Sequence, residues 1–141
     1  MYESDQTRIL LVDDHAATRE TIKELVEQRR GWVVSAEAGS GHQAVGLADE
    51  CKPDVVVMDM QMPDGNGLEA SVDMLGENPE LNVLIVSNYV DSALVKAALE
   101  VGVLGYISKE NVFEELAPAI EAVSHKKHYL CKRIKLQTRL P

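Results

Sequence analysis

Short runs of aliphatic residues recur along the chain at nearly regular intervals. They cover residues 9–12, 32–36, 54–58, 82–86 and 104–108. The first, third and fourth are continuous runs rather than alternating ones, which is the pattern of strands buried on both faces of a parallel sheet. The pattern therefore predicts five short strands.

Between these runs, apolar residues return with the period of an α-helix. Ile22, Leu25 and Val26 hold positions i, i+3 and i+4 of one such stripe. Each later segment has a stripe that we expect to face the core: Ala44, Leu47, Ala48 and Cys51; Leu68, Val72 and Leu75; Leu94, Ala97, Ala98 and Val101; Leu116, Ile120 and Val123. Strands and helices thus alternate five times, which predicts an open α/β sheet with helices on both faces.

Four residues bear on where the last two helices begin, bend and end. Asp91 and Asn111 are suitable N-caps for the fourth and fifth helices, and Gly102 is suited to end the fourth. Pro118 falls inside the fifth helical pattern, on the side away from its apolar stripe. We expect it to bend that helix rather than break it.

Polar residues of a particular kind stand directly after four of the predicted strands. Asp13 and Asp14 follow the first strand, Asp59 the third, Ser87 the fourth and Lys109 the fifth. Ligands of open α/β sheets bind beyond the carboxyl ends of the strands, so these side chains should meet at one edge. Taken alone, the two neighbouring aspartates could equally be a turn and an N-cap, but the presence of Asp59 and Lys109 argues against that interpretation.

Three carboxylates held close together repel one another unless a positive charge is present. A magnesium ion suits a few carboxylates, water and a substrate phosphate. A carboxylate can also act as a nucleophile and form an aspartyl-phosphate, and that reaction mainly needs positioning and charge neutralisation. The residues therefore point to phosphoryl chemistry at this edge.

Four segments together resemble the response-regulator receiver family. They are VDDH (12–15), VVVMDMQMPDGNGLE (55–69), IVS (85–87) and GYISK (105–109), and the resemblance extends over about residues 7–125. It implies a receiver domain with a (βα)5, doubly wound, five-stranded parallel sheet in the order 2-1-3-4-5, the flavodoxin-like and CheY-like fold.

The resemblance also implies the roles of individual residues. Asp59 would be the phospho-acceptor, and a sensor histidine kinase would be the donor. Mg²⁺ would be held by Asp13 and Asp14, directly or through water, by Asp59, and by the backbone carbonyl of Gln61.

The remaining implied roles concern signalling. Ser87 would be the switch hydroxyl, Tyr106 the coupled aromatic and Lys109 the cation that contacts the phosphoryl group. Serine replaces the threonine that is frequent in the family, which loses a methyl group but keeps the hydroxyl. On phosphorylation we expect Ser87 to move toward the phosphoryl group and Tyr106 to rotate inward, reshaping a face made of the fourth helix, fifth strand and fifth helix. A homodimer through that face is the first partner we expect.

The sequence of the second half of the chain, including ALEVGVLGYISK (98–109), most resembles that of receivers that precede a LuxR/NarL-type DNA-binding domain. We expect a receiver cut from such a regulator, with a free-standing receiver as the alternative. Residues 126–141 hold six of the 14 basic residues and none of the 23 acidic ones, and we interpret them as a basic tail or linker. The remaining acidic body argues against nucleic-acid binding by the domain itself.

Three other functions deserve comparison. A phosphatase of the haloacid-dehalogenase class would carry a second aspartate two residues after the nucleophile, whereas this chain has Gln61 there, so we expect no enzyme beyond slow self-phosphorylation and autodephosphorylation. A flavodoxin-like domain would bind an anionic cofactor that Asp13 and Asp14 would repel. A degenerate receiver used only for docking would not need the intact acids.

The remaining features concern location. The start of the chain lacks a basic segment followed by a long apolar one, and the aliphatic runs are too short to span a membrane. Cys51 and Cys131 show no metal-like spacing. We expect a cytoplasmic protein with reduced thiols.

Overall fold

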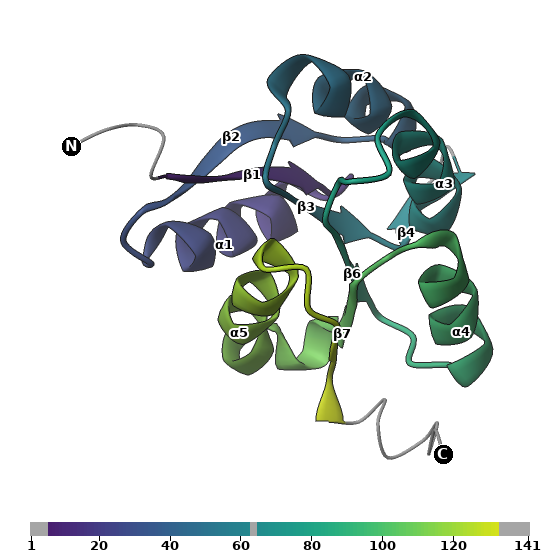
Figure 1. Cartoon of the computed structure of the whole chain (residues 1–141). Coiled ribbons are helices and arrows are strands. Elements are labelled where there is room, and N and C mark those ends of the chain that lie inside the picture. Colours follow the sequence, from purple (N-terminus) through teal and green to yellow (C-terminus); the bar gives the residue numbers. More distant parts are fainter. Residues whose placement is uncertain (1–5, 63–64, 133–141) are drawn as a thin grey trace.

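A parallel β-sheet forms the centre of the molecule (Figure 1). The structure, a computed structural model, describes residues 6–62 and 65–132. The strands of this sheet are β1 (Thr7–Val12), β2 (Trp32–Ala38), β3 (Val55–Asp59), β6 (Val83–Ser87), β7 (Gly105–Ser108) and β8 (Tyr129–Leu130). Their order is β2-β1-β3-β6-β7-β8. The predicted order of the first five is therefore confirmed.

The sixth strand corrects the prediction of a five-stranded sheet. β8 lies within residues 126–141, which the sequence led us to interpret as a tail, and it pairs in parallel with β7. Tyr129 N–H donates to the carbonyl of Leu104 at 3.0 Å, and Cys131 N–H to that of Tyr106 at 3.2 Å. Two residues are too few to produce an alternating pattern, and the basic residues around them conceal the strand. The strand forms because the edge of β7 offers backbone groups that residues 129–131 can bond.

Helices cover both faces of the sheet, as predicted. Figure 1 shows α1 (Ala16–Glu27) and α5 (Val112–Ser124) on one face, and α2 (Gly41–Cys51), α3 (Gly67–Glu77) and α4 (Ser92–Val101) on the other. A single 3-10 turn, Lys109–Asn111, leads into α5. A small antiparallel hairpin of β4 (Gln61–Met62) and β5 (Gly65–Asn66) leads into α3.

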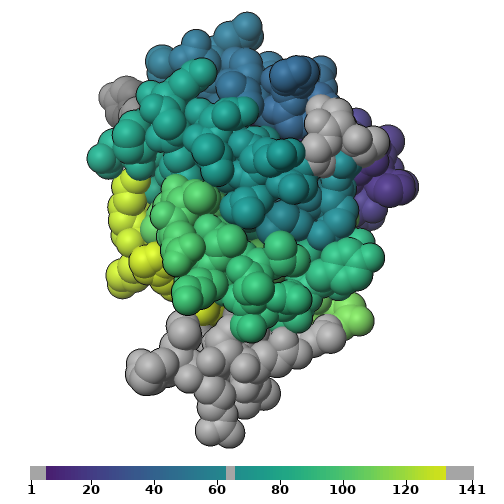
Figure 2. Space-filling view, turned by 90° about the vertical axis from the view of Figure 1, so that its right-hand side faces the viewer, coloured from purple at the N-terminus to yellow at the C-terminus, as the bar shows by residue number. Residues whose placement is uncertain are grey.

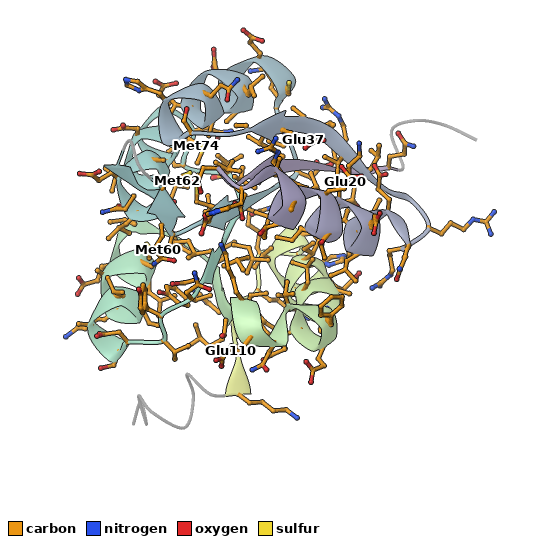
Figure 3. All side chains as sticks on the ribbon, turned by 180° about the vertical axis from the view of Figure 1, so that it is seen from behind. Glu20, Glu37, Met60, Met62, Met74 and Glu110 are labelled. Carbon is orange, nitrogen blue, oxygen red and sulfur yellow. The ribbon has the colours of Figure 1, made fainter. Side chains whose placement is uncertain are left out.

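The centre of the sheet is buried on both sides. Every residue of β3 and of β6 is buried, as their continuous apolar runs predict. Met62 and Met74, a residue of α3, lie on the side of the sheet where α2 and α3 pack (Figure 3). Both side chains are buried and belong to the hydrophobic core.

The helix faces follow the predicted stripes in part. Leu116, Ile120 and Val123 of α5 are all buried. In α3, however, Val72 is 47% exposed, and the core face runs instead through Ala70, Ser71, Met74 and Leu75. The reason is close packing between helices: a Cβ added to Gly41 of α2 would lie 3.2 Å from that of Ala70, so the small residues of α3 must face α2.

The helix α4 shows a similar rotation. Val95 and Ala98 are buried, whereas Leu94, Ala97 and Val101, the other members of the predicted apolar stripe, are half-buried. The half-buried residues lie at the border of the apolar face, so this helix turns part of its apolar surface outward.

The predicted helix ends have different outcomes. The Asp91 carboxylate accepts from Ala93 N–H at 2.7 Å, and Gly102 ends α4 with φ 107°. Asn111 stands at the N-cap position of α5 but makes no capping bond with its side chain. Its ψ of 21° is far from the extended backbone that capping needs, because the preceding 3-10 turn already leads into the helix. Pro118 is exposed, and α5 continues through it.

Two glycines of α3 provide a matched test of this packing. A Cβ at Gly67 would lie 2.3 Å from the backbone oxygen of Asp59, whereas one at Gly76 would meet nothing within 4 Å. We expect Gly67→Ala to lower the free energy of unfolding by about 1–3 kcal/mol through overpacking. Gly76→Ala should raise it by about 0.5–1 kcal/mol because alanine favours the helix. Urea unfolding of both variants checks this, and equal effects would contradict the close approach at Gly67.

Candidate functional site

The carboxyl ends of four neighbouring strands bring the predicted site residues together. Asp13 directly follows β1, Asp59 is the last residue of β3, Ser87 is the last of β6, and Lys109 directly follows β7. The strand register keeps them level, since Val12 lies opposite Met58 and Ser87 opposite Ser108. The parallel fold therefore places these side chains at one edge, as predicted.

Lys109 joins the two most deeply buried carboxylates. Its Nζ lies 3.1 Å from Oδ1 of Asp59 and 3.4 Å from Oδ2 of Asp13, and each aspartate is only 2% exposed. Burial raises the pKa of Asp59 above its ordinary value, and the neighbouring Asp13 adds to this, while Lys109 and the Gln61 N–H oppose it. A single ammonium thus partly offsets the repulsion between two buried acids.

Three carboxylate oxygens at this edge have no hydrogen-bond donor among the described residues. They are Oδ2 of Asp13, Oδ1 of Asp14 and Oδ2 of Asp59, all inaccessible to solvent. Unsatisfied buried oxygens are costly, and hard divalent cations such as Mg²⁺ prefer oxygen ligands of this type. These three oxygens therefore fit a site for such an ion. The predicted role of the Gln61 carbonyl stays a prediction.

His15 lies closer to these acids than the sequence suggested. Ligand atoms of Asp13, Asp14 and His15 come within 4.8 Å of one another. The ring is 74% exposed, and its Nδ1 is 3.5 Å from Oδ1 of Asp14. The sequence analysis gave it no role. The only signal was its place directly after the two aspartates.

The Ser87 hydroxyl is buried and already engaged. Its oxygen accepts a hydrogen bond from Gln61 Nε2 at 3.2 Å and another from Tyr89 N–H at 3.0 Å. The other end of the Gln61 amide accepts from Asn88 N–H at 3.3 Å. The family resemblance implies a role only for the backbone of Gln61, and no sequence pattern indicates that its side chain reaches across to Ser87.

Tyr106 already occupies the inward position. It is 0% exposed, and its hydroxyl donates to the carbonyl of Tyr89 at 3.1 Å. Burial raises the pKa of the Tyr106 phenol, and a hydrogen bond with Ser87 opposes that rise. We expected inward rotation only after phosphorylation. Here the Tyr89 carbonyl supplies the buried acceptor that the phenol needs, so the ring is inside without it.

Arg19 is a further residue that the sequence analysis missed. From α1, its Nη1 donates to the backbone carbonyl of Asp13 at 2.5 Å, and its Nε to Glu37 at 2.9 Å. Glu37 lies on β2 next to α1 (Figure 3) and also meets Lys23 at 3.5 Å. This ion-pair cluster fixes the loop that carries Asp13, and only the folded contact between α1 and β2 reveals it.

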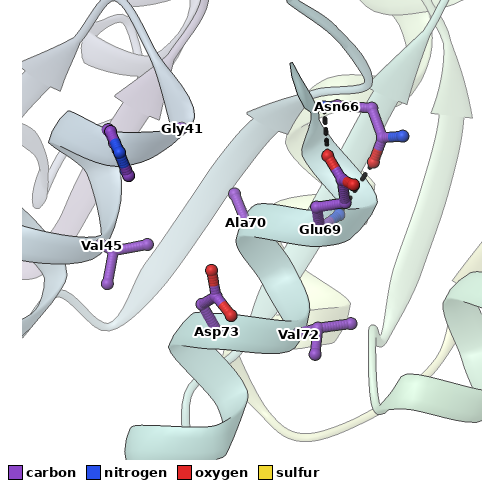
Figure 4. Close-up of a pocket in the computed structure, with 8 residues that line it drawn as sticks. Gly41, Val45, Asn66, Glu69, Ala70, Val72 and Asp73 are labelled. Carbon is purple, nitrogen blue, oxygen red and sulfur yellow. Dashed lines mark hydrogen bonds between the residues drawn. The ribbon is translucent and has the colours of Figure 1, made fainter. Parts of the chain in front are cut away.

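A hollow between α2 and α3 lies apart from these acids (Figure 4). Val45, Ala70 and Asp73 line it, and Asn66 and Glu69 stand at its rim. Asn66 and Glu69 are occupied by their mutual capping box at the start of α3. The hollow contains none of the predicted site residues.

Comparison with known proteins identifies the family of the chain. The model of the response regulator receiver domain matches residues 9–121. The chain belongs to the response-regulator receiver family. Among solved structures, it is similar to a LuxR-family two-component response regulator from Aurantimonas sp. SI85-9A1, with a TM-score of 0.92 and 35% identity over 95% of this chain and 96% of that one. The response regulator domain of Thermotoga maritima CheB has a TM-score of 0.74 and 29% identity, over 96% of this chain and 98% of that one.

Curated relatives of this receiver are longer regulators. The Bacillus subtilis transcriptional regulatory protein YxjL is 35% identical over 120 residues, which are 85% of this chain and 55% of YxjL. The response regulator GacA of Pseudomonas aeruginosa is 33% identical, over 94% of this chain and 62% of GacA. The chain thus spans little more than half the length of these relatives. Among the described residues, the receiver has no helix long and apolar enough to cross a membrane.

The raised pKa of Asp59 has a consequence for stability. A carboxyl with a raised folded-state pKa favours folding when protonated, so its contribution is lost as the pH rises through that pKa. In the presence of a chelator, we therefore expect Asp59→Asn to be more stable than wild type at pH 7. The difference should shrink as the pH falls to about 4, near the pKa of an unperturbed aspartate.

Thermal unfolding across this pH range measures the effect. Asp73→Asn, which changes an exposed aspartate of α3, is the control and should behave like wild type. A destabilised Asp59→Asn at pH 7 would show that the Asp59 charge is well compensated in the receiver, contrary to our account.

Proposed function

We propose that this receiver takes a phosphoryl group from the phosphohistidine of a sensor kinase onto Asp59. The observation that carries the proposal is the bridge from Lys109 to Asp59 and Asp13, which leaves Oδ2 of Asp59 without a partner. That oxygen is the nucleophile. As its bond to phosphorus forms, the bond from phosphorus to the histidine nitrogen breaks, and the electron pair stays with the imidazole.

The burial of the site serves this reaction. With Asp59 2% exposed, little water can compete with it for the phosphoryl group. The Lys109 ammonium is already in position beside the acceptor, so it can neutralise phosphoryl charge without a large movement. Such prior positioning is the main contribution that a protein makes to phosphoryl transfer.

The acid cluster would hold the metal that the reaction needs. Asp13, Asp14 and Asp59 offer the three oxygens that accept no hydrogen bond, and we propose the Gln61 carbonyl as a further ligand. Bound Mg²⁺ would supply neutralisation of the charge on the transferred group. His15 lies near enough to join the set, but magnesium prefers oxygen, so we propose no ligand role for it.

We propose that the signal begins at Ser87. A phosphoryl group on Asp59 brings new acceptor oxygens to the site, and the Ser87 hydroxyl can donate to one of them. We propose that Ser87 turns away from Gln61 and Tyr89 as it does so, which rearranges the loop that also binds the Tyr106 hydroxyl. Signalling therefore runs from Asp59 through Ser87 to Tyr106.

The regulated partner is the second part of the proposal. Relatives named as transcriptional regulatory proteins support a DNA-binding output domain under the control of this receiver. Tyr89, which is 61% exposed, lies just before α4, and we propose the surface of α4, β7 and α5 as a homodimer contact. A free-standing receiver that acts through protein contacts is the alternative. The two cysteines are both free, which supports a cytoplasmic location.

An aspartate-nucleophile phosphatase is the rival with the most similar chemistry. It would need a second acid beside Asp59 to activate water for rapid turnover. Gln61 occupies that place, and its amide is engaged with Ser87 and Asn88. We therefore propose a stoichiometric phospho-acceptor with slow release rather than an enzyme.

Labelling tests the acceptor directly. With Mg²⁺ and acetyl phosphate, intact-mass spectrometry should show one phosphoryl group on the wild-type receiver and none on Asp59→Asn, because the nucleophile is gone. Asp73→Asn should be labelled like wild type. Undiminished phosphate on Asp59→Asn would refute the assignment, and catalytic turnover without a stable adduct would favour the phosphatase.

Magnesium should stabilise the folded receiver. Binding to the native state alone adds about 1.4 kcal/mol when the ion is at ten times its dissociation constant. We expect thermal unfolding to show this gain for wild type and to show it much reduced for Asp14→Asn, which loses one of the unpaired oxygens. If Mg²⁺ leaves wild type unchanged over a millimolar titration, the ion is not bound at this site.

A further inference from the structure

The chain beyond α5 folds back onto the strand that carries Tyr106. Residues 126–132, which we call the strap, begin with Lys126 in the left-handed conformation at φ 64°. The Lys126 side chain reaches the carbonyl and the carboxylate of Glu80. The strap then forms β8 beside β7. In Figure 2, the C-terminal part of the described chain, in yellow, lies at the margin of the molecule beside the green of α4.

The strap and Tyr106 are joined at the backbone. Leu130 lies opposite Tyr106 in the register of β7 and β8, and Cys131 N–H donates to the Tyr106 carbonyl at 3.2 Å. The Cys131 side chain is 0% exposed. Burial raises the pKa of the phenols of Tyr106 and Tyr129, and the Cys131 thiol adds slightly to each rise.

A second bond ties the strap to α5. The Tyr129 hydroxyl donates to the Glu115 carboxylate at 2.8 Å, and Glu115 is only 8% exposed. A hydrogen bond to a buried charged acceptor is stronger than one between neutral groups. β8 itself has only two residues, so the Tyr129–Glu115 bond and the burial of Cys131 hold the strap in place.

Tyr106 thus has two ends with different partners. Its hydroxyl donates to the Tyr89 carbonyl, while the Tyr89 N–H donates to Ser87. Its backbone accepts from the strap. A continuous series of contacts therefore joins the Ser87 hydroxyl, next to the acceptor site, to the place where the chain leaves the sheet.

We propose that the strap is a latch that stabilises the resting arrangement of Ser87, Tyr89 and Tyr106, and that a phosphoryl group on Asp59 loosens it. The proposal rests on the proposed function, because it needs Asp59 to be the acceptor. When Ser87 turns toward the phosphoryl group, Tyr89 N–H loses its acceptor and the loop that fixes the Tyr106 hydroxyl rearranges. The packing that buries Cys131 is then weakened.

Such a short strand is a suitable element to release. Segments with few backbone bonds open locally at much lower cost than the core does. Coupling between two sites is reciprocal, so a strap that opens when the acceptor site is filled must also oppose filling while it is closed. Weakening the strap should therefore tighten binding at the acceptor site, which a purely structural role would not do.

The test uses the two cysteines of the chain. In Cys51→Ser, Cys131 is the remaining thiol, and its alkylation by N-ethylmaleimide can be followed by intact-mass spectrometry. Saturation with Mg²⁺ and beryllofluoride, a mimic of the phosphoryl group, should speed alkylation about five-fold, the effect of losing about one net hydrogen bond. Adding Asp59→Asn should abolish the change. Fluorine NMR of bound beryllofluoride reports separately whether the acceptor site is filled.

A matched pair of variants tests the latch itself. Tyr129→Phe removes the donor to Glu115 and should speed alkylation about five-fold without beryllofluoride and tighten beryllofluoride binding by a similar factor. Glu115→Gln keeps an acceptor oxygen but loses its charge, so it should speed alkylation and tighten beryllofluoride binding by less than Tyr129→Phe does. Bound beryllofluoride with unchanged or slower alkylation would overturn the latch but leave the acceptor assignment intact. Failure to bind beryllofluoride at all would overturn both.

Discussion

The electrostatic repulsion between acids held together at one edge of the sheet is the constraint on which the arrangement of the site depends. Asp13 and Asp59 are nearly inaccessible to water, and the ammonium of Lys109 between them is the cation that both contact. One positive charge cannot satisfy two buried carboxylates and the neighbouring Asp14, so three oxygens stay without donors. This shortage of positive charge is the reason for proposing that Asp13, Asp14 and Asp59 would hold a divalent cation next to the acceptor.

The rest of the fold maintains this arrangement. Parallel strands bring the acids, the hydroxyl and the amine to one edge, and Arg19 fixes the Asp13 loop from α1. Gln61 and Tyr89 each donate a hydrogen bond to the Ser87 hydroxyl. Tyr106 connects that loop to β8 at the other edge of β7. Charge at the acceptor can thus be converted into movement at a surface, because each neighbour of Ser87 has a second contact further out.

The sequence predicted what depends on local pattern. Continuous apolar runs indicated the buried strands. The residues directly after those runs indicated the site, because the carboxyl ends of parallel strands lie at the same edge of the sheet. The core face of α3 was misjudged because apolar spacing alone cannot show that Ala70 must approach Gly41 closely. β8 was missed for a related reason: a two-residue strand is specified by the free edge of β7, which exists only after folding.

Side-chain contacts across the site were equally beyond a single sequence. Nothing in the pattern around Gln61 shows that its amide spans Ser87 and Asn88, because that depends on where two loops end in space. The same holds for the inward position of Tyr106, which depends on the carbonyl of Tyr89. Residue types and strand ends identify which groups meet, whereas the resting state of the switch is a property of the packed structure.

The central claim is that Lys109 partly offsets the charge of the buried acids and prepares Asp59 for phosphoryl transfer. The most direct measurement is the rate of labelling by acetyl phosphate in Lys109→Met, which keeps the length of the side chain but removes its charge. Our account predicts that the folded variant is labelled about a hundred-fold more slowly than wild type at saturating Mg²⁺, the usual cost of removing one preorganised charge-stabilising group. Labelling at the wild-type rate would contradict it.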